Sequence, residues 1–213
     1  MPDANSNPVL RLRAALEPLA LTSPTLAGLA VASPSQQPTL IMQFTDEAGH
    51  RRQIDLPLLA DLFHARFTPP SLPANAALDL RLWSAIQDDT VDPRSLIAPA
   101  GQPLIGLSTP LVIETASQTE LGALHALWTI AQRRHSPALR ERCVQAAEFL
   151  IAELQPDNAT NHPFAVAVFL ALAEAGNFEA MLYAQTLIHN CQVQLGRPDA
   201  FSAALLLHAA RQP

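Results

Sequence analysis

From about Thr119 to the end of the chain, hydrophobic residues recur three and four positions apart. This spacing is the period of an amphipathic α-helix. Ser117 or Thr119 can cap the first helix, Ser136 and Pro137 are typical of a helix start, and Gly176 is typical of a helix end. The predicted helices cover about 119–134, 137–154, 163–175, 178–195 and from 199 to near the C-terminus.

These helices repeat with a period of 42 residues, since Pro156-Asp157 recurs as Pro198-Asp199. Each pair follows a helix that ends in leucine and precedes an almost wholly apolar helix, at 164–173 and 201–210. A period in this range is typical of paired helices stacked side by side. The sequence therefore predicts a mainly α fold of stacked helical hairpins over residues 116–213, a partial solenoid or α/α toroid.

The first part of the chain has a different pattern, because 14 of the 19 prolines precede residue 111. Short apolar runs and turn residues there predict a small α+β portion over residues 1–115 that contains a β-hairpin. The hairpin is predicted from strands at 39–44 and 50–54 around a turn at 46–49. Further predicted elements are a helix capped by Asp55, a helix at 76–86 and one bent or two short strands at 103–113.

The last predicted helix is apolar nearly all round, over residues 203–210. A solenoid normally ends in a repeat with a polar outer face, and a helix without one must be buried. We expect this helix to be covered either by the N-terminal portion folding back or by a second protein chain. The sequence thus predicts a protein partner or a homo-oligomer that forms through the C-terminal helix.

The composition narrows the class of protein. Hydrophobic residues make up 49 % of the 213 residues, which is enough for a packed core, and the net charge of -6 disfavours nucleic-acid binding. All 13 basic residues are arginine, which is typical of a GC-rich bacterial genome. Charged residues interrupt the first twenty positions, and the longest apolar run, 164–173, is too short to cross a bilayer. We therefore expect a cytoplasmic protein without a membrane span, in which Cys143 and Cys191 are buried free thiols.

One segment resembles a known superfamily. The run from Glu153 to Asn158, followed by an apolar helix that ends at Gly176, is similar to the repeat of α/α toroids such as terpenoid cyclases and protein prenyltransferases. In that repeat a glutamine ends a helix, and an aspartate-glycine turn and an aromatic residue follow; the matching residues here are Gln155, Asp157 and Phe164. Asn158 replaces the turn glycine, and the aspartate-rich and zinc-binding motifs of those enzymes are missing. The resemblance, over about 90 residues, implies the fold without the activity.

The densest polar cluster lies in the loop 155–162. Its aspartate, asparagine and histidine side chains could bind a sugar or a metal or act in acid–base catalysis. The alternative is a turn whose Thr160 or Asn161 caps the next helix. His125 lies on an apolar helix face, where it is either a core residue or part of a pocket with this loop. The candidate ligand-binding residues are His125, Asp157, Asn158, Asn161 and His162.

The sequence contains no nucleophile elbow, phosphate loop, dinucleotide fingerprint or metal-binding histidine pair, so it predicts no catalytic residues, no cofactor and no metal. We therefore expect a helical-repeat binding or scaffold protein without catalytic activity. The alternative is an enzyme or small-ligand binder of the α/α type that takes a hydrophobic or carbohydrate ligand at the loop 155–162. An enzyme would require His125, Asp157 and His162 to face one concave pocket.

Overall fold

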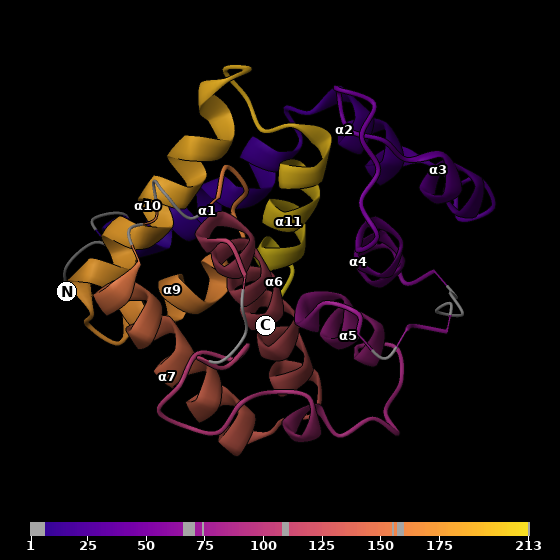
Figure 1. The fold of residues 1–213 in the computed structure, drawn as a ribbon. Coiled ribbons are helices and arrows are strands. Elements are labelled where there is room, and N and C mark those ends of the chain that lie inside the picture. Colours follow the sequence, from indigo (N-terminus) through magenta and orange to yellow (C-terminus); the bar gives the residue numbers. More distant parts are fainter. Residues whose placement is uncertain are drawn as a thin grey trace.

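The computed structural model describes residues 7–65, 71–73, 75–107, 111–154, 156 and 160–212. Throughout these ranges every regular element is helical and no strand occurs, so the prediction of a mainly α fold is confirmed (Figure 1). The elements are α1 (Pro8–Ala20), α2 (Pro24–Val31), α3 (Gln37–Gln43), α4 (Asp55–Leu62), α5 (Leu78–Ala85), the 3-10 turn η2 (Pro93–Ser95), α6 (Ile113–Arg133), α7 (Pro137–Glu153), α9 (Val166–Glu174), α10 (Phe178–Val193) and α11 (Ala200–Ala210).

The predicted N-terminal β-hairpin is wrong. Most of its first strand lies in α3, with Pro38 in the first turn, and its second strand is irregular. The turn between them is present, because the carbonyl of Asp46 accepts the Gly49 N–H at 3.0 Å. A short apolar run carries too few residues to distinguish a period of two from one of 3.6. In α3 only Ile41 is buried. The helix therefore turns one residue toward the core, whereas a strand would alternate buried and exposed residues.

The strands predicted at 103–113 are also absent from the described part of that range, 103–107 and 111–113. Ile113 begins α6, which therefore starts six residues before the predicted Thr119. Ser117 is inside the helix, where its hydroxyl donates to the Ile113 carbonyl at 2.7 Å instead of capping. The backbone N–H of Leu104 donates to the buried carboxylate of Glu120 on α6, so a side chain replaces the expected strand pairing.

The other C-terminal helix ends follow the sequence closely. Ser136 caps α7, and the carboxylate of Asp199 caps α11 by accepting the Ser202 N–H at 2.7 Å. Gly176 follows α9 with φ 103°, a left-handed conformation that favours glycine. The start of α9 differs, because Ala165 with φ 55° precedes Val166 as its N-cap. Asn161 and Thr160 lie too far before the helix to cap it.

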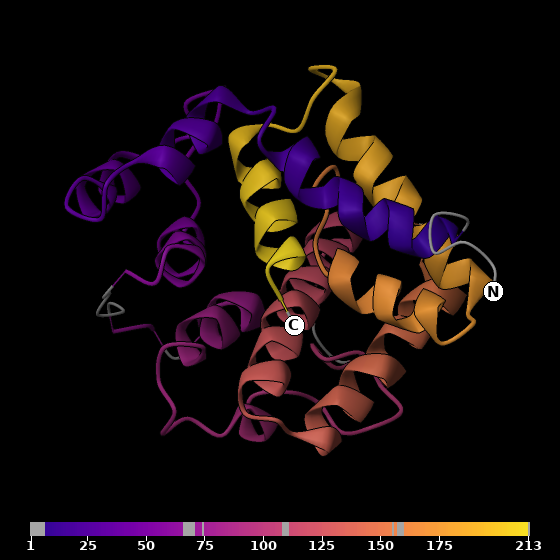
Figure 2. The ribbon, with the colours of Figure 1, turned by 180° about the vertical axis from the view of Figure 1, so that it is seen from behind.

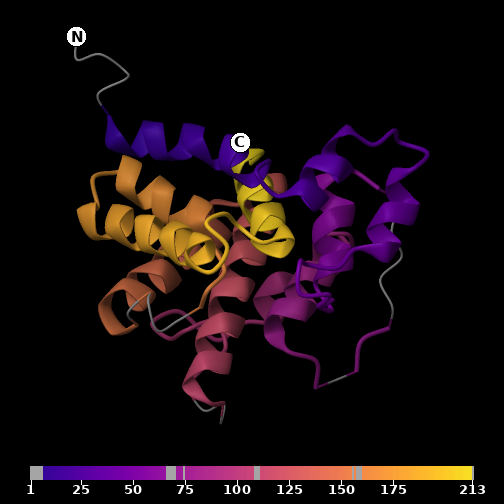
Figure 3. The same ribbon diagram turned by 90° about the horizontal axis from the view of Figure 1, so that it is seen from above.

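Helices α6 and α7 pack as one hairpin and α9 and α10 as a second, with α7 against α9. Figure 3 shows α2, α3 and α4 gathered on one side of the molecule and the hairpin of α9 and α10 on the other. The strongest contacts between early and late helices are α5 with α6, α1 with α11 and α4 with α11. The likeness to toroid repeats and the division near residue 115 stay predictions.

Helix α11 is covered by the chain itself. Residues 200–209 are all buried, and the helices against them are α1, α2, α4 and α9. Figure 2 shows α1 lying across α9 and α11. Of the two alternatives expected for the last helix, the structure therefore shows burial by the N-terminal portion. The exposed apolar surface from which a protein partner was predicted at this helix is not present. Among the described residues no single helix is long and apolar enough to span a membrane; α1 and α2 together reach the length but are bent by 86°.

Candidate functional site

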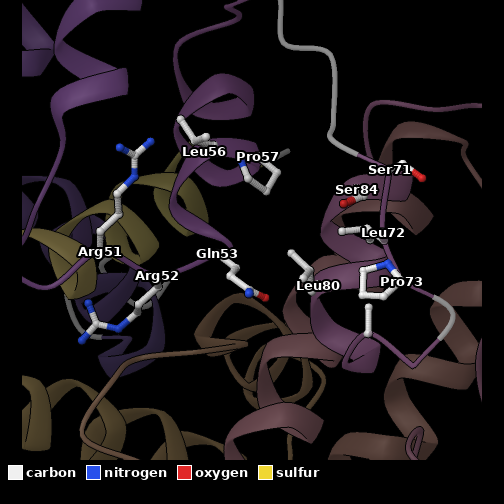
Figure 4. Close-up of a pocket in the computed structure, with 11 residues that line it drawn as sticks. Arg51, Arg52, Gln53, Leu56, Pro57, Ser71, Leu72, Pro73, Leu80 and Ser84 are labelled. Atoms are coloured by element: carbon white, nitrogen blue, oxygen red, sulfur yellow. The ribbon is translucent and has the colours of Figure 1, made fainter.

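A pocket of about 490 Å³ lies between α4 and α5, and we call it the α4–α5 pocket. Apolar side chains from both helices and from residues 71–73 form most of its wall (Figure 4). The lining residues are Arg51, Arg52, Gln53, Leu56, Pro57, Ser71, Leu72, Pro73, Ala76, Leu80 and Ser84. A volume of this size, lined mainly by apolar groups with a few polar ones, is typical of small-molecule sites.

The sequence of each helix explains which side chains reach this pocket. In α4, Leu58 and Leu59 are fully buried in the core, which leaves Leu56 and Pro57 toward the pocket. In α5, Leu80 and Ser84 are four residues apart and therefore share a face of the helix. The adjoining Leu82 and Trp83 are fully buried and hold α5 on α6. Four of the eleven lining residues thus come from helices anchored in the core, and the other seven lie in the segments 51–53 and 71–76.

The two arginines at the pocket edge are bound elsewhere. The guanidinium of Arg52 donates to Asp46 at 3.0 Å, lies 3.2 Å from Nε2 of His162 and stacks 4.2 Å over the ring of Phe201. The guanidinium of Arg51 donates to the Met42 carbonyl at 2.7 Å. Figure 4 shows both guanidinium groups directed away from Leu80, whereas the Gln53 amide reaches toward it. Apart from these two arginines, the polar lining residues are neutral: Gln53, Ser71 and Ser84.

A second hollow of about 380 Å³ adjoins this pocket at the N-terminal end of α5, and we call it the α5–α6 groove. The two share Arg52, Gln53 and Leu80 in their walls. The groove also contains the carboxylate of Asp79 and polar side chains of α6. Its lining residues are Arg52, Gln53, Ile54, Ala77, Asp79, Leu80, Thr115, Gln118 and Thr119.

A buried histidine pair, His125 and His208, joins α6 to α11 on the other side of α4. The backbone N–H of Ala165 donates to Nδ1 of His125 at 3.2 Å, so the proton of a neutral His125 is on Nε2. That Nε2–H donates to Nδ1 of His208 at 3.0 Å, and Nε2–H of His208 donates to Asp61 at 2.8 Å. Burial, and then the neighbouring His208, lower the pKa of His125 well below 6.5, so His125 is neutral.

Asp61 connects this pair to a polar pocket of about 240 Å³ at the C-terminal ends of α4, α6 and α11. Its carboxylate accepts from Gln87 at 3.0 Å and forms an ion pair with Arg133. The ring of Trp83 packs on both histidine rings, with centroids 5.2 and 5.5 Å away. Both nitrogens of His208 are occupied, which suits a core hydrogen-bond network better than a general base.

The structure describes three of the five predicted site residues, His125, Asn161 and His162, and the predicted site stays a prediction. Nδ1 of His162 lies 2.8 Å from the Ser202 hydroxyl, six residues from His208 along α11, so His162 and His125 bond to different parts of that helix. Burial, and then Arg52, lower the pKa of His162 to about 4. Asn161 is exposed, and Asp157 and Asn158 lie outside the described residues. Neither His125 nor His162 lines the pockets described above.

Comparison with protein-family models, with curated proteins and with solved structures gave no match. Within the described ranges, no three histidine, cysteine, aspartate or glutamate side chains are placed to hold a metal ion.

Sequence reasoning missed Asp61 and the α4–α5 pocket. A signal for Asp61 is present, because it interrupts the apolar run 56–63, and an acid on a buried helix face needs a partner. The pocket has no such signal, since its walls come from segments whose packing cannot be read from spacing.

Proposed function

We propose that this protein binds a small, mainly apolar molecule in the α4–α5 pocket and does not transform it. The observation that carries the proposal is the volume of about 490 Å³ between two helices that are themselves anchored in the core. Small-molecule sites are typically hollows of about 300–1,000 Å³ with mainly apolar walls. A hollow of this size with apolar walls suits an apolar occupant, because filling it removes apolar surface from water.

The polar groups of the pocket support binding rather than catalysis. Among the described residues that line it there is no aspartate, glutamate, histidine or cysteine. Ser71 and Ser84 therefore have no base in the wall that could activate their hydroxyls. Gln53 and the two serines can instead orient one carbonyl, hydroxyl or amide of a bound molecule. Of the two ligand classes expected from the sequence, the apolar wall favours the hydrophobic one over a carbohydrate.

The proposal is tested with N-phenyl-1-naphthylamine, a neutral apolar probe whose fluorescence rises in apolar surroundings. We expect saturable binding of one probe per chain. Ser84→Phe places an aromatic ring in the pocket and should abolish the signal. Ser35→Phe makes the same change at an exposed position outside the pocket and should leave it unchanged.

Both variants are first compared with the wild type by thermal unfolding, so that a loss of binding is not a loss of fold. Equal probe binding by the two variants, or no binding by the wild-type protein, would refute the proposal. Native mass spectrometry of the freshly purified protein then identifies any molecule that the pocket retains from the cell.

A further inference from the structure

Asp79 is a half-buried acid in the first turn of α5, at the floor of the α5–α6 groove. It lies against Gly122 of α6, where an added Cβ would be 3.1 Å from the Asp79 Cβ and 3.3 Å from Oδ2. The missing side chain at Gly122 thus lets the carboxyl group settle between the two helices. This position brings the acid beside the shared wall of the groove and the α4–α5 pocket, Gln53 and Leu80.

The carboxyl group of Asp79 has no cationic partner among the described side chains. Burial raises its pKa, and the only opposing influences are the backbone N–H groups of Leu80 and of Asp79 itself. Three other acids with buried contacts each form an ion pair: Asp46 with Arg52, Glu47 with Arg197 and Asp61 with Arg133. The buried Asp55 and Glu120 form no ion pair among the described residues and accept backbone N–H groups instead. Carboxylates that leave water are usually paired, because an unpaired buried charge is costly.

Arg52, the one cation among the described residues of the groove wall, is not available to Asp79. Arg52 donates to Asp46 and is held by His162 and the ring of Phe201. The remaining polar side chains of the groove are Gln53, Thr115, Gln118 and Thr119, all neutral. They offer oxygen acceptors but no positive charge.

We infer that Asp79 binds the ammonium group of an amphipathic amine whose apolar body occupies the α4–α5 pocket. The inference rests on the proposed function and names the chemical class of the ligand. An ammonium group supplies the positively charged partner that Asp79 lacks among the described side chains. Its further N–H groups can donate to the hydroxyl and amide oxygens of the groove. The same carboxylate would repel a fatty acid, so the site selects amines against carboxylates of equal length.

The test compares two ligands of one shape, heptylamine and heptan-1-ol, by their displacement of N-phenyl-1-naphthylamine from the wild-type protein. At about pH 8 the amine is protonated. Both head groups can donate a hydrogen bond to the carboxylate, but only the ammonium group adds an attraction between opposite charges, so we expect the amine to bind about tenfold more tightly. Heptanoate should bind more weakly than either.

Asp79→Asn should remove the preference for the amine while the alcohol binds as before. Asp89→Asn is the matched control, because the Asp89 side chain is 96 % exposed and lies outside both hollows. If the probe and the alcohol bind but the amine has no advantage in the wild-type protein, the inference is overturned and the proposed function stands. If neither probe nor alcohol binds, the proposed function fails and the inference with it. The wild-type comparison decides even if Asp79→Asn does not fold.

Discussion

Replacing Asp61 with asparagine tests the network that joins α4, α6 and α11. The side chain of Asp61 is 4 % exposed and receives hydrogen bonds from Gln87 and His208 and an ion pair from Arg133. All three partners are donors, and a carboxylate accepts on both oxygens. An asparagine has the same shape but one oxygen and one NH2 group. Its NH2 group must point at one of these donors, so that two N–H groups face each other without an acceptor.

The conflict extends beyond the substituted residue. If the new NH2 group faces His208, that ring must move its proton to Nδ1, which then meets the Nε2–H of His125. If His125 in turn moves its proton to Nδ1, it meets the N–H of Ala165. In this orientation, no choice of histidine tautomers gives every N–H group from position 61 to Ala165 an acceptor. The alternative orientation leaves the NH2 group against Gln87 and Arg133.

Removing one partner of a buried charged network destabilises a protein by about 3–5 kcal/mol. Arg133 is 42 % exposed and can regain water, so we expect the lower end, about 3 kcal/mol. For a chain of this length that corresponds to a fall in Tm of about 6–12 °C. Urea unfolding followed by far-UV circular dichroism measures the loss in free energy of unfolding, with Asp89→Asn as the exposed control. Nitrogen-15 NMR of the imidazoles reports whether the two tautomers change.

A loss of less than about 1 kcal/mol with unchanged imidazole signals would show that the network does not have this order of donors and acceptors.

The remaining predictions concern pH, helix contacts and the cover of α11. The lowered pKa values of His125 and His162 mean that the folded state binds fewer protons than the unfolded one below about pH 6.5, so the free energy of unfolding falls on acidification. Asp55, whose pKa burial raises to about 6, and Asp79 and Glu120, whose pKa values burial raises less, act in the opposite direction. We expect the two histidines to dominate, so that the free energy of unfolding falls between pH 6 and 5 in urea titrations; greater stability at pH 5 would contradict this. Gly28→Ala should stabilise the protein by up to about 1 kcal/mol, because α2 has open space at this position. Gly122→Ala should destabilise it, because the new Cβ would lie 3.1 Å from the Cβ of Asp79 on α5. The melting temperatures of the two variants test both predictions. Deleting α1 should expose α11 and cause self-association, and a monomer in sedimentation velocity would exclude that role.

The sequence predicted the C-terminal helices well because several signals agree there. Periodicity, the caps at Ser136 and Asp199 and the glycine at 176 all mark the same boundaries. In the N-terminal portion the signals conflict. Pro8 and Pro24 stand in the first turns of α1 and α2, where proline favours a helix start, yet a high proline content also suggests loops.

The candidate site was predictable only in fragments. The sequence placed His125 on an apolar face, but its partner His208 follows 83 residues later. Asp61, the partner of His208, precedes that histidine by 147 residues. Hydrogen bonds over such separations depend on how helices pack, and spacing along one helix cannot show them. The α4–α5 pocket is harder still, because it is a property of the space between elements and of no residue by itself.

The burial of α11 and the α4–α5 pocket have one structural cause. At the start of α11, the carboxylate of Glu47 accepts the Ala200 N–H and the guanidinium of Arg197. Near its end, His208 donates to Asp61. Both acids belong to the N-terminal segment, which therefore replaces the polar end repeat that a stack of hairpins needs. Holding α4 on α11 in this way also sets α4 beside α5, where the pocket forms. A change that releases the N-terminal segment should therefore expose the last helix and abolish ligand binding together.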